Sequence, residues 1–178
     1  MRVLGGTAKG RLLKAVVGTR PTAARVRAAL FSALEAMGAS VDRVLDLYAG
    51  SGALGIEALS RGASWCDFVE QDRRACAQIR RNLVATGLAG RASVICSSVE
   101  RALGRLRGPY SLILADPPYR DERALETLAQ LASSALVVVG LTTIVIEHRS
   151  SQPMPSAMGP FRLVKTLRHG DSALSFYR

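Results

Sequence analysis

The chain has 178 residues, of which 48% are apolar and 21% charged, and its formal net charge at pH 7 is +10. This length corresponds to about one domain, and the apolar content excludes a wholly disordered chain. The longest apolar run, residues 135–141, is far shorter than the roughly 20 residues that span a bilayer, and we recognise no secretory leader. We therefore expect a cytoplasmic protein without a membrane segment.

Positive charge is concentrated before residue 40, where seven basic residues stand against one acid. The basic residues are Arg2, Lys9, Arg11, Lys14, Arg20, Arg25 and Arg27. Such a segment suits a polyanion, most simply a nucleic acid, although a protein that is basic throughout would also show it. Residues 1–5 and 11–17 resemble short strands around a glycine turn. We predict an N-terminal β-hairpin extension for RNA binding at 1–19, ahead of a main domain at 20–178.

A helix is predicted from about Thr22, because a threonine–proline start signal precedes apolar residues at helical spacing. These residues include Val26, Leu30 and Leu34, and Gly38 ends the helix. Short apolar strands then alternate with helices, which predicts a parallel sheet covered on both faces. The strands are expected at 44–48, 65–70, 92–96, 110–115 and 141–147, with helices ending near 60, at 73–86, at 99–106 and at 122–132. Residues 150–160 read as a surface loop, and 161–167 with 173–177 as an antiparallel hairpin.

A glycine turn follows the first strand of this alternating region. Gly50, Gly52 and Gly55 match G-x-G-x-x-G, a pattern that by itself equally suits a dinucleotide. Asp46 lies just before the turn, where its charge would repel a pyrophosphate and attract an ammonium group. Glu70 closes the second strand, a place from which a carboxylate can accept hydrogen bonds from ribose hydroxyls. The two carboxylates favour S-adenosylmethionine, which has an ammonium group and no phosphate.

The sequence Asp116-Pro117-Pro118-Tyr119 ends the fourth strand, which neighbours the first strand in this topology. The Asp116 carboxylate and the Pro117 carbonyl can accept the two N–H bonds of an exocyclic amine, so that its lone pair points at a methyl donor. Consecutive prolines stiffen the loop, and Tyr119 offers a ring on which an extruded base can stack. We predict that these four residues form the catalytic motif.

Other reactive side chains are not assigned to catalysis. His148 and His169 lie at a strand end and in a turn, outside both motifs, and we expect neither to act as a general base. Cys66, Cys76 and Cys96 contain no C-x-x-C pair, so we expect a reduced protein with no metal site and with these cysteines as core fillers.

Taken together, these motifs resemble the bacterial 16S rRNA (guanine-N2)-methyltransferases of the RsmD type, essentially end to end. The resemblance is carried by 2–6, 9–11, Arg20-Pro21-Thr22, 25–27, 29–31, 45–63, 116–119 and 170–174. It implies a Rossmann-like class I methyltransferase fold, with a mostly parallel seven-stranded sheet that ends in an antiparallel hairpin. It also implies S-adenosylmethionine as donor and a guanine of 16S rRNA as acceptor, within the small subunit or a late assembly intermediate. We expect a monomer.

The resemblance also assigns residues to the ligands. Residues 46–52 would bind the methionine part of the donor, Glu70 the ribose, and Ser98 with Val99 the adenine. The full cofactor set is Asp46, Tyr48, Ala49, Gly50, Ser51, Gly52, Glu70, Gln71, Ser98, Val99 and Asp116. The RNA set is Arg2, Lys9, Arg11, Lys14, Arg20, Thr22, Arg25 and Arg27. Ala24 and Ala28 stand where the family usually has acids, and Ser98 where it usually has Asn or Asp.

Three alternatives remain at this stage. An N6-adenine methyltransferase would share the Asp-Pro-Pro-Tyr motif. A nicotinamide-dependent dehydrogenase would share the glycine turn, but the chain shows no hydride-transfer site. An RNA-binding chaperone that has lost catalysis would not need Asp116 and Tyr119. NADH binding and nucleoside analysis of methylated rRNA distinguish these classes.

Overall fold

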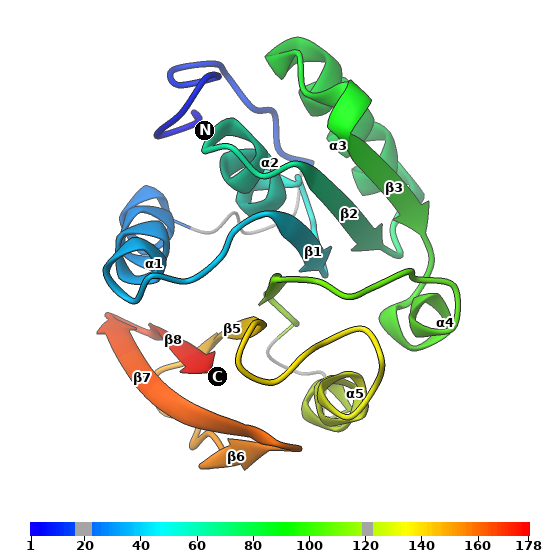
Figure 1. Ribbon diagram of the computed structural model, residues 1–178. Helices are drawn as coiled ribbons and strands as arrows, with labels where there is room; N and C mark the ends of the chain where they lie inside the picture. Colours follow the sequence, from blue (N-terminus) through cyan, green and yellow to red (C-terminus); the bar gives the residue numbers. More distant parts are fainter. Residues whose placement is uncertain (17–22, 119–122) are drawn as a thin grey trace.

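The computed structural model describes residues 1–16, 23–118 and 123–178, and in this part of the chain one mixed sheet carries helices on both faces (Figure 1). The helices are α1 (Ala24–Ala36), α2 (Ala53–Ser60), α3 (Arg73–Thr86), the short 3-10 turn Ala89–Arg91, α4 (Val99–Leu103) and α5 (Ala124–Ala132). The strands are β1 (Arg43–Leu47), β2 (Trp65–Glu70), β3 (Ala92–Cys96), β4 (Leu112–Ala115), β5 (Thr143–Arg149), β6 (Ala157–Met158), β7 (Phe161–His169) and β8 (Ser172–Tyr177).

The sheet follows the order β3-β2-β1-β4-β5-β8-β7-β6. Strands β1 to β5 are parallel to their neighbours, whereas β8 lies antiparallel between β5 and β7. The predicted alternation and the C-terminal hairpin are confirmed. The expected strand number is wrong, because β6 adds an eighth strand within the predicted loop 150–160. A strand of two residues is too short to leave an alternating pattern in the sequence.

Two hydrophobic clusters lie on opposite faces of the sheet. Helices α1, α2 and α3 cover one face and α4 and α5 the other (Figure 1). Neighbouring residues of a strand point to opposite faces, so Val44 belongs to the first cluster and Leu45 to the second. Because both faces are covered, the central strands are apolar almost throughout, which explains why they were visible in the sequence.

The N-terminal segment is not the predicted two-stranded hairpin. Its two arms meet in a single antiparallel bridge between Arg2 and Leu12, and the predicted second strand reaches Val17, which lies outside the described residues. Side chains of α2 replace the missing strand contacts. Glu57 accepts a hydrogen bond from Leu4 N at 2.8 Å, and Ser60 Oγ accepts one from Ala8 N at 2.9 Å. The segment therefore packs as a cover on α2.

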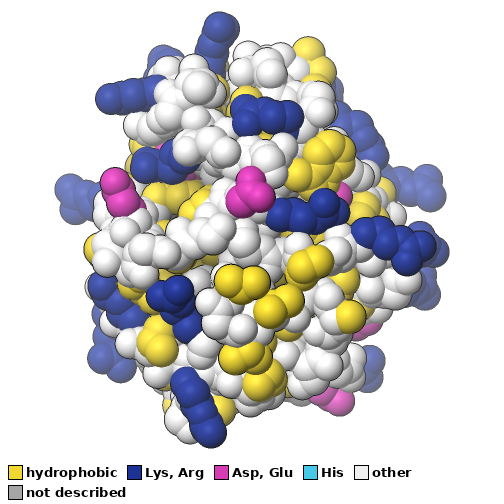
Figure 2. Space-filling model, in the orientation of Figure 1, with side chains coloured by type: hydrophobic (Ala, Val, Ile, Leu, Met, Phe, Trp, Pro, Cys, Tyr) yellow, Lys and Arg dark blue, Asp and Glu magenta, His cyan; other side chains and the backbone are white. Residues whose placement is uncertain are grey.

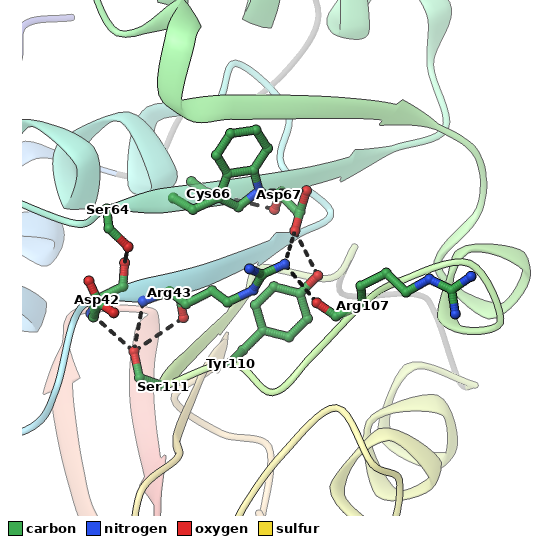
Figure 3. Close-up of polar contacts among 9 residues, drawn as sticks. Asp42, Arg43, Ser64, Cys66, Asp67, Arg107, Tyr110 and Ser111 are labelled. Atoms are coloured by element: carbon green, nitrogen blue, oxygen red, sulfur yellow. Dashed lines mark hydrogen bonds and ion pairs between the residues drawn. The ribbon is translucent and has the colours of Figure 1, made fainter.

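The amino ends of the central strands are closed by a polar network around the buried Asp67 (Figure 3). The Tyr110 hydroxyl donates to its carboxylate at 2.7 Å and the indole N–H of Trp65 at 3.0 Å. Arg43 lies 3.9 Å from the same carboxylate. Burial raises the pKa of Tyr110, followed by its hydrogen bond to Asp67, so the tyrosine stays protonated and keeps donating. The network joins β1, β2 and β4 at the end opposite their carboxyl termini.

Candidate active site

A cavity of about 590 Å³ opens at the carboxyl ends of the parallel strands. The sequence-predicted residues that line it are Asp46, Tyr48, Ala49, Gly50, Ser51, Glu70, Gln71, Ser98, Val99, Asp116, Pro117 and Pro118. Parallel strands present their carboxyl ends at one edge of the sheet, which is why segments about 70 residues apart share one cavity. Tyr119 lies outside the described residues. The cavity therefore brings the glycine turn and the proline motif together.

Positive φ angles shape the turn after β1. Tyr48 has a φ of 56°, and among the described residues it is the one non-glycine with a positive φ. Such a conformation costs roughly 1–2 kcal/mol for an L-residue and tends to occur at functional sites. Gly50 has a φ of 55°, and a Cβ added there would meet no atom within 4 Å. The backbone is thus open toward a ligand at Gly50.

Gly52 differs from the other predicted cofactor residues, because it does not line the cavity. A Cβ added at Gly52 would lie 3.1 Å from Ile79 and 3.3 Å from Phe68, in the core under the turn. Gly55 is closer still, since a Cβ there would lie 2.4 Å from Phe68. These two glycines let α2 pack against β2, and the exposed backbone of the motif is at Gly50.

Asp46 is 1% exposed, and its Oδ2 accepts a hydrogen bond of 2.8 Å from Gly55 N at the start of α2. Burial raises the pKa of Asp46 well above its usual value. The Gly55 hydrogen bond opposes that shift, whereas the charges of Asp116 and Glu70 add to it. A cationic ligand group in the cavity would favour the ionised carboxylate, because opposite charges lower the pKa of an acid.

Glu70 holds the glycine turn from the neighbouring strand. Its Oε2 accepts from Gly50 N at 2.8 Å, and its Oε1 accepts from Asp72 N, also at 2.8 Å. Asp72 in turn caps α3 through hydrogen bonds from Arg74 N and Ala75 N. A carboxylate has about four acceptor sites, so Glu70 retains capacity for ribose hydroxyls. The sequence assigned it only the ribose, and its role in the turn was not foreseen.

The proline motif begins directly after β4. Asp116 N donates to Leu47 O at 3.5 Å, a contact that ties the motif to the end of β1. Asp116 and Pro117 are half-buried and Pro118 is exposed. At the other end of the cavity, Ser98 precedes α4 without capping it through its side chain. Its hydroxyl therefore does not serve as a helix cap.

Several lining residues were not predicted. These are Ala23, Val26, Ala53, Leu54, Val69, Ser97, Glu100, Glu147, His169, Asp171 and Ser172. Glu147 closes a strand just as Glu70 does, which is a signal the sequence contained. His169 reaches the cavity from the β7–β8 turn, and only the sheet order shows this. His148 instead is buried beside Ser175 Oγ, 2.8 Å from its Nε2.

The predicted RNA residues separate into two groups. Arg2, Lys9, Arg11, Lys14 and Arg25 are exposed, as are Ala24 and Ala28, whereas Arg20 and Thr22 lie outside the described residues. On the face shown in Figure 2, Lys and Arg side chains are spread widely and acidic side chains are few.

The structure contradicts the prediction for Arg27, which is only 1% exposed. Its Nη2 donates to Arg2 O at 2.8 Å, so it joins α1 to the N-terminal segment. Burial lowers the pKa of Arg27, and the Glu57 charge opposes that shift. Leu30 and Phe31 follow at helical spacing, a signal that Arg27 faces inward.

The prediction for the cysteines is correct at two positions of three. Cys66 and Cys76 are buried and Cys96 is exposed. Cys96 ends β3, which is the edge strand of the sheet and has no further strand to cover it. Edge strands bury fewer of their side chains than central strands.

The fold and the cavity define a class I S-adenosylmethionine-dependent methyltransferase. An RNA methyltransferase from Salinibacter ruber, solved with S-adenosyl-L-homocysteine, shares this fold at 17% identity and a TM-score of 0.65, over 89% of this chain and 92% of that one. The family model described as Conserved hypothetical protein 95 matches residues 1–178. The chain belongs to this family, that of RsmD and YlbH.

Individual relatives align over almost their whole length. YlbH of Bacillus subtilis is 36% identical, over 100% of this chain and 98% of YlbH. Ribosomal RNA small subunit methyltransferase D of Escherichia coli is 35% identical, over 97% of this chain and 93% of the relative. The solved structure of Escherichia coli yhhF has a TM-score of 0.86 at 34% identity, over 99% and 96% of the two chains. No helix of residues 1–16, 23–118 and 123–178 is long and apolar enough to cross a membrane.

Proposed function

We propose that this protein transfers a methyl group from S-adenosylmethionine to the exocyclic N2 amine of a guanine in 16S rRNA. The main support is one cavity that joins Asp46, the Gly50 backbone and Glu70 to Asp116 and Pro117. The identity to the Escherichia coli relative, whose name gives the ribosomal RNA of the small subunit, supports the substrate class. Acting there would place the protein in the cytoplasm.

The cavity fits the donor better than it fits a dinucleotide. Asp46 would hold the ammonium group, Glu70 the ribose, and Ser98 and Val99 the adenine. The open backbone at Gly50 allows a ligand to approach closely, and the cavity volume of about 590 Å³ lies in the range of small-molecule sites. A buried carboxylate beside the turn would repel the pyrophosphate of NAD. When bound, S-adenosylmethionine supplies a methyl group on a cationic sulfur.

Asp116 and Pro117 would prepare the acceptor amine. An exocyclic nitrogen is a poor nucleophile, because its lone pair is delocalised into the purine ring. The Asp116 carboxylate and the Pro117 carbonyl would accept its two N–H bonds and turn the lone pair out of the ring plane. Since the prolines and the Leu47 contact hold the loop, these acceptors need little reorganisation. The proton lost from the methylated amine would pass to Asp116 or to water.

The exposed basic residues would bind the rRNA backbone. Arg2, Lys9, Arg11 and Lys14 belong to the segment that covers α2, and Arg25 lies on α1. The first residues before α1, Ala23 among them, line the cavity. Phosphate contacts on this side would therefore lie next to the catalytic cavity and fix the register of the RNA. The small subunit or a late assembly intermediate is the proposed partner, and the active form is a monomer.

Nucleoside mass spectrometry tests the proposal. Small subunits are incubated with protein and isotopically labelled donor, and N2-methylguanosine is the expected product. Asp116→Asn should lower the single-turnover rate about 10²–10³-fold, because a preorganised electrostatic partner is lost. Donor affinity should change little, and the exposed Glu126→Gln on α5 serves as control. N6-methyladenosine would refute the guanine assignment, and NADH binding without methyl transfer would favour a dehydrogenase.

A further inference from the structure

Carboxylates line the cavity in the order of the strands that carry them. Glu70 belongs to β2, Asp46 to β1, Asp116 follows β4, and Glu147 belongs to β5. Along the sheet, these strands succeed one another as β2-β1-β4-β5. The proposed function assigns the first three to the donor and the acceptor amine, and it leaves Glu147 without a role. Glu147 is 6% exposed, which is costly for a carboxylate with no function or partner in the fold.

Strand register places Glu147 beside Asp116 on one face of the sheet. Ala115 pairs with Ile146 in the parallel β4–β5 ladder, so Asp116 and Glu147 each follow by one residue. Equivalent residues of neighbouring strands point to the same face, and the strands lie about 4.8 Å apart. Glu147 pairs with Leu174 on β8, whose side chain lies in the cluster under α1 to α3. Both carboxylates therefore face the cavity from the side of α1.

His169 continues the same row from β7. Leu174 pairs with Leu167, and His169 lies two residues further along β7, so it points to the same face as Leu167. Its Nε2 is buried and, within the described part of the chain, makes no hydrogen bond. The imidazole lines the cavity, as does Ser172, its partner across the β7–β8 turn. A buried ring nitrogen without a partner at a cavity wall is suited to a ligand.

This pair of side chains matches the edge of a guanine. Guanine presents N1–H beside its N2 amine, and then the acceptors O6 and N7. A carboxylate next to Asp116 can accept the N1–H, and an imidazole N–H further along can donate to O6 or N7. Adenine would direct the N1 lone pair at the carboxylate, which is repulsive. A carboxylate can accept several hydrogen bonds, so this role is compatible with other contacts of Glu147.

We propose that Glu147 and His169 form the base-recognition end of the cavity and select guanine over adenine as the acceptor. Asp116 lies between this end and the donor end, which is the position that an amine entering transfer must occupy. This inference rests on the proposed function and specifies its acceptor site. The alternative N6-adenine activity would gain nothing from a carboxylate at this position.

Single-turnover methyl transfer to small subunits tests the proposal. Glu147→Gln keeps the size of the side chain and should lower the rate at saturating subunit about 10- to 100-fold, because a charge-assisted hydrogen bond is lost. Affinity for subunits and for S-adenosylhomocysteine should stay within about twofold, because phosphates and the donor end carry it. His169→Phe, at a less buried position, should also slow transfer. Glu126→Gln is again the matched control.

The outcomes separate this inference from the proposed function. If the unmutated protein methylates guanine and both variants react at its rate, the base-recognition assignment is wrong and the function stands. Equal losses of donor affinity and melting temperature would also overturn it, since they indicate a structural role. In the S-adenosylhomocysteine complex, the His169 ring resonances should shift with guanosine 5′-monophosphate and not with adenosine 5′-monophosphate. Equal shifts with both nucleotides, or with neither, would refute guanine selection.

Discussion

Glu70 is expected to serve the donor ribose and the glycine turn at once, and Glu70→Gln separates these roles. In the structure its two oxygens accept 2.8 Å hydrogen bonds from Gly50 N and Asp72 N. Glutamine offers one oxygen and one amide group, so one of the two backbone N–H groups would face a donor. Hydrogen bonds to a charged group contribute about 1.5–3 kcal/mol each, and the lower end applies because Glu70 is only half-buried.

A change in donor affinity alone would not reveal the ribose contact, because a distorted turn also weakens binding. A double-mutant cycle removes this ambiguity. Calorimetry compares S-adenosylhomocysteine with its 2′,3′-dideoxy analogue, each on the unmutated protein and on Glu70→Gln. The loss caused by the turn occurs with both ligands and cancels. If Glu70 accepts from the ribose, a coupling energy of about 1.5–3 kcal/mol remains, which is about a 10- to 150-fold difference in affinity.

Strictly additive effects would refute the ribose role. The mutation would then weaken both ligands by the same factor, and Glu70 would be a residue of the turn alone. Glu126→Gln controls for loss of a surface carboxylate, since Glu126 is exposed on α5.

Three further predictions follow from particular contacts. Burial raises the pKa of Asp46, so its ionisation opposes folding, and stability should fall as pH rises through its folded pKa. Asp46→Asn should remove that decline in thermal melts while weakening donor binding; an unchanged pH profile would contradict this. Gly55→Ala should cost about 1–3 kcal/mol, because its Cβ would overlap Phe68, and an unaltered melting temperature would show that the core adapts. Arg11→Gln with Lys14→Gln should reduce the salt dependence of RNA binding by about 0.7–0.9 in log–log slope per phosphate contact, and equal slopes would place the RNA elsewhere.

Local patterns in the sequence determined most of the fold. The central strands are buried on both faces, so they appear as short apolar runs, and the helices between them have a 3.6-residue period. The glycine turn and the proline motif each follow such a strand directly, and their position at the carboxyl edge follows from that order. For the same reason Asp46, Glu70 and Asp116 could be expected in one cavity.

Tertiary structure decided which side of an element a residue faces and which distant segments meet. Arg25 and Arg27 are equivalent in charge, but Arg27 lies under the N-terminal segment and Arg25 does not. Gly50 and Gly52 belong to one motif, yet only Gly50 opens toward the cavity. His169 joins the site because β8 inserts between β5 and β7. These outcomes depend on long-range pairing and packing, whose partners no local periodicity encodes.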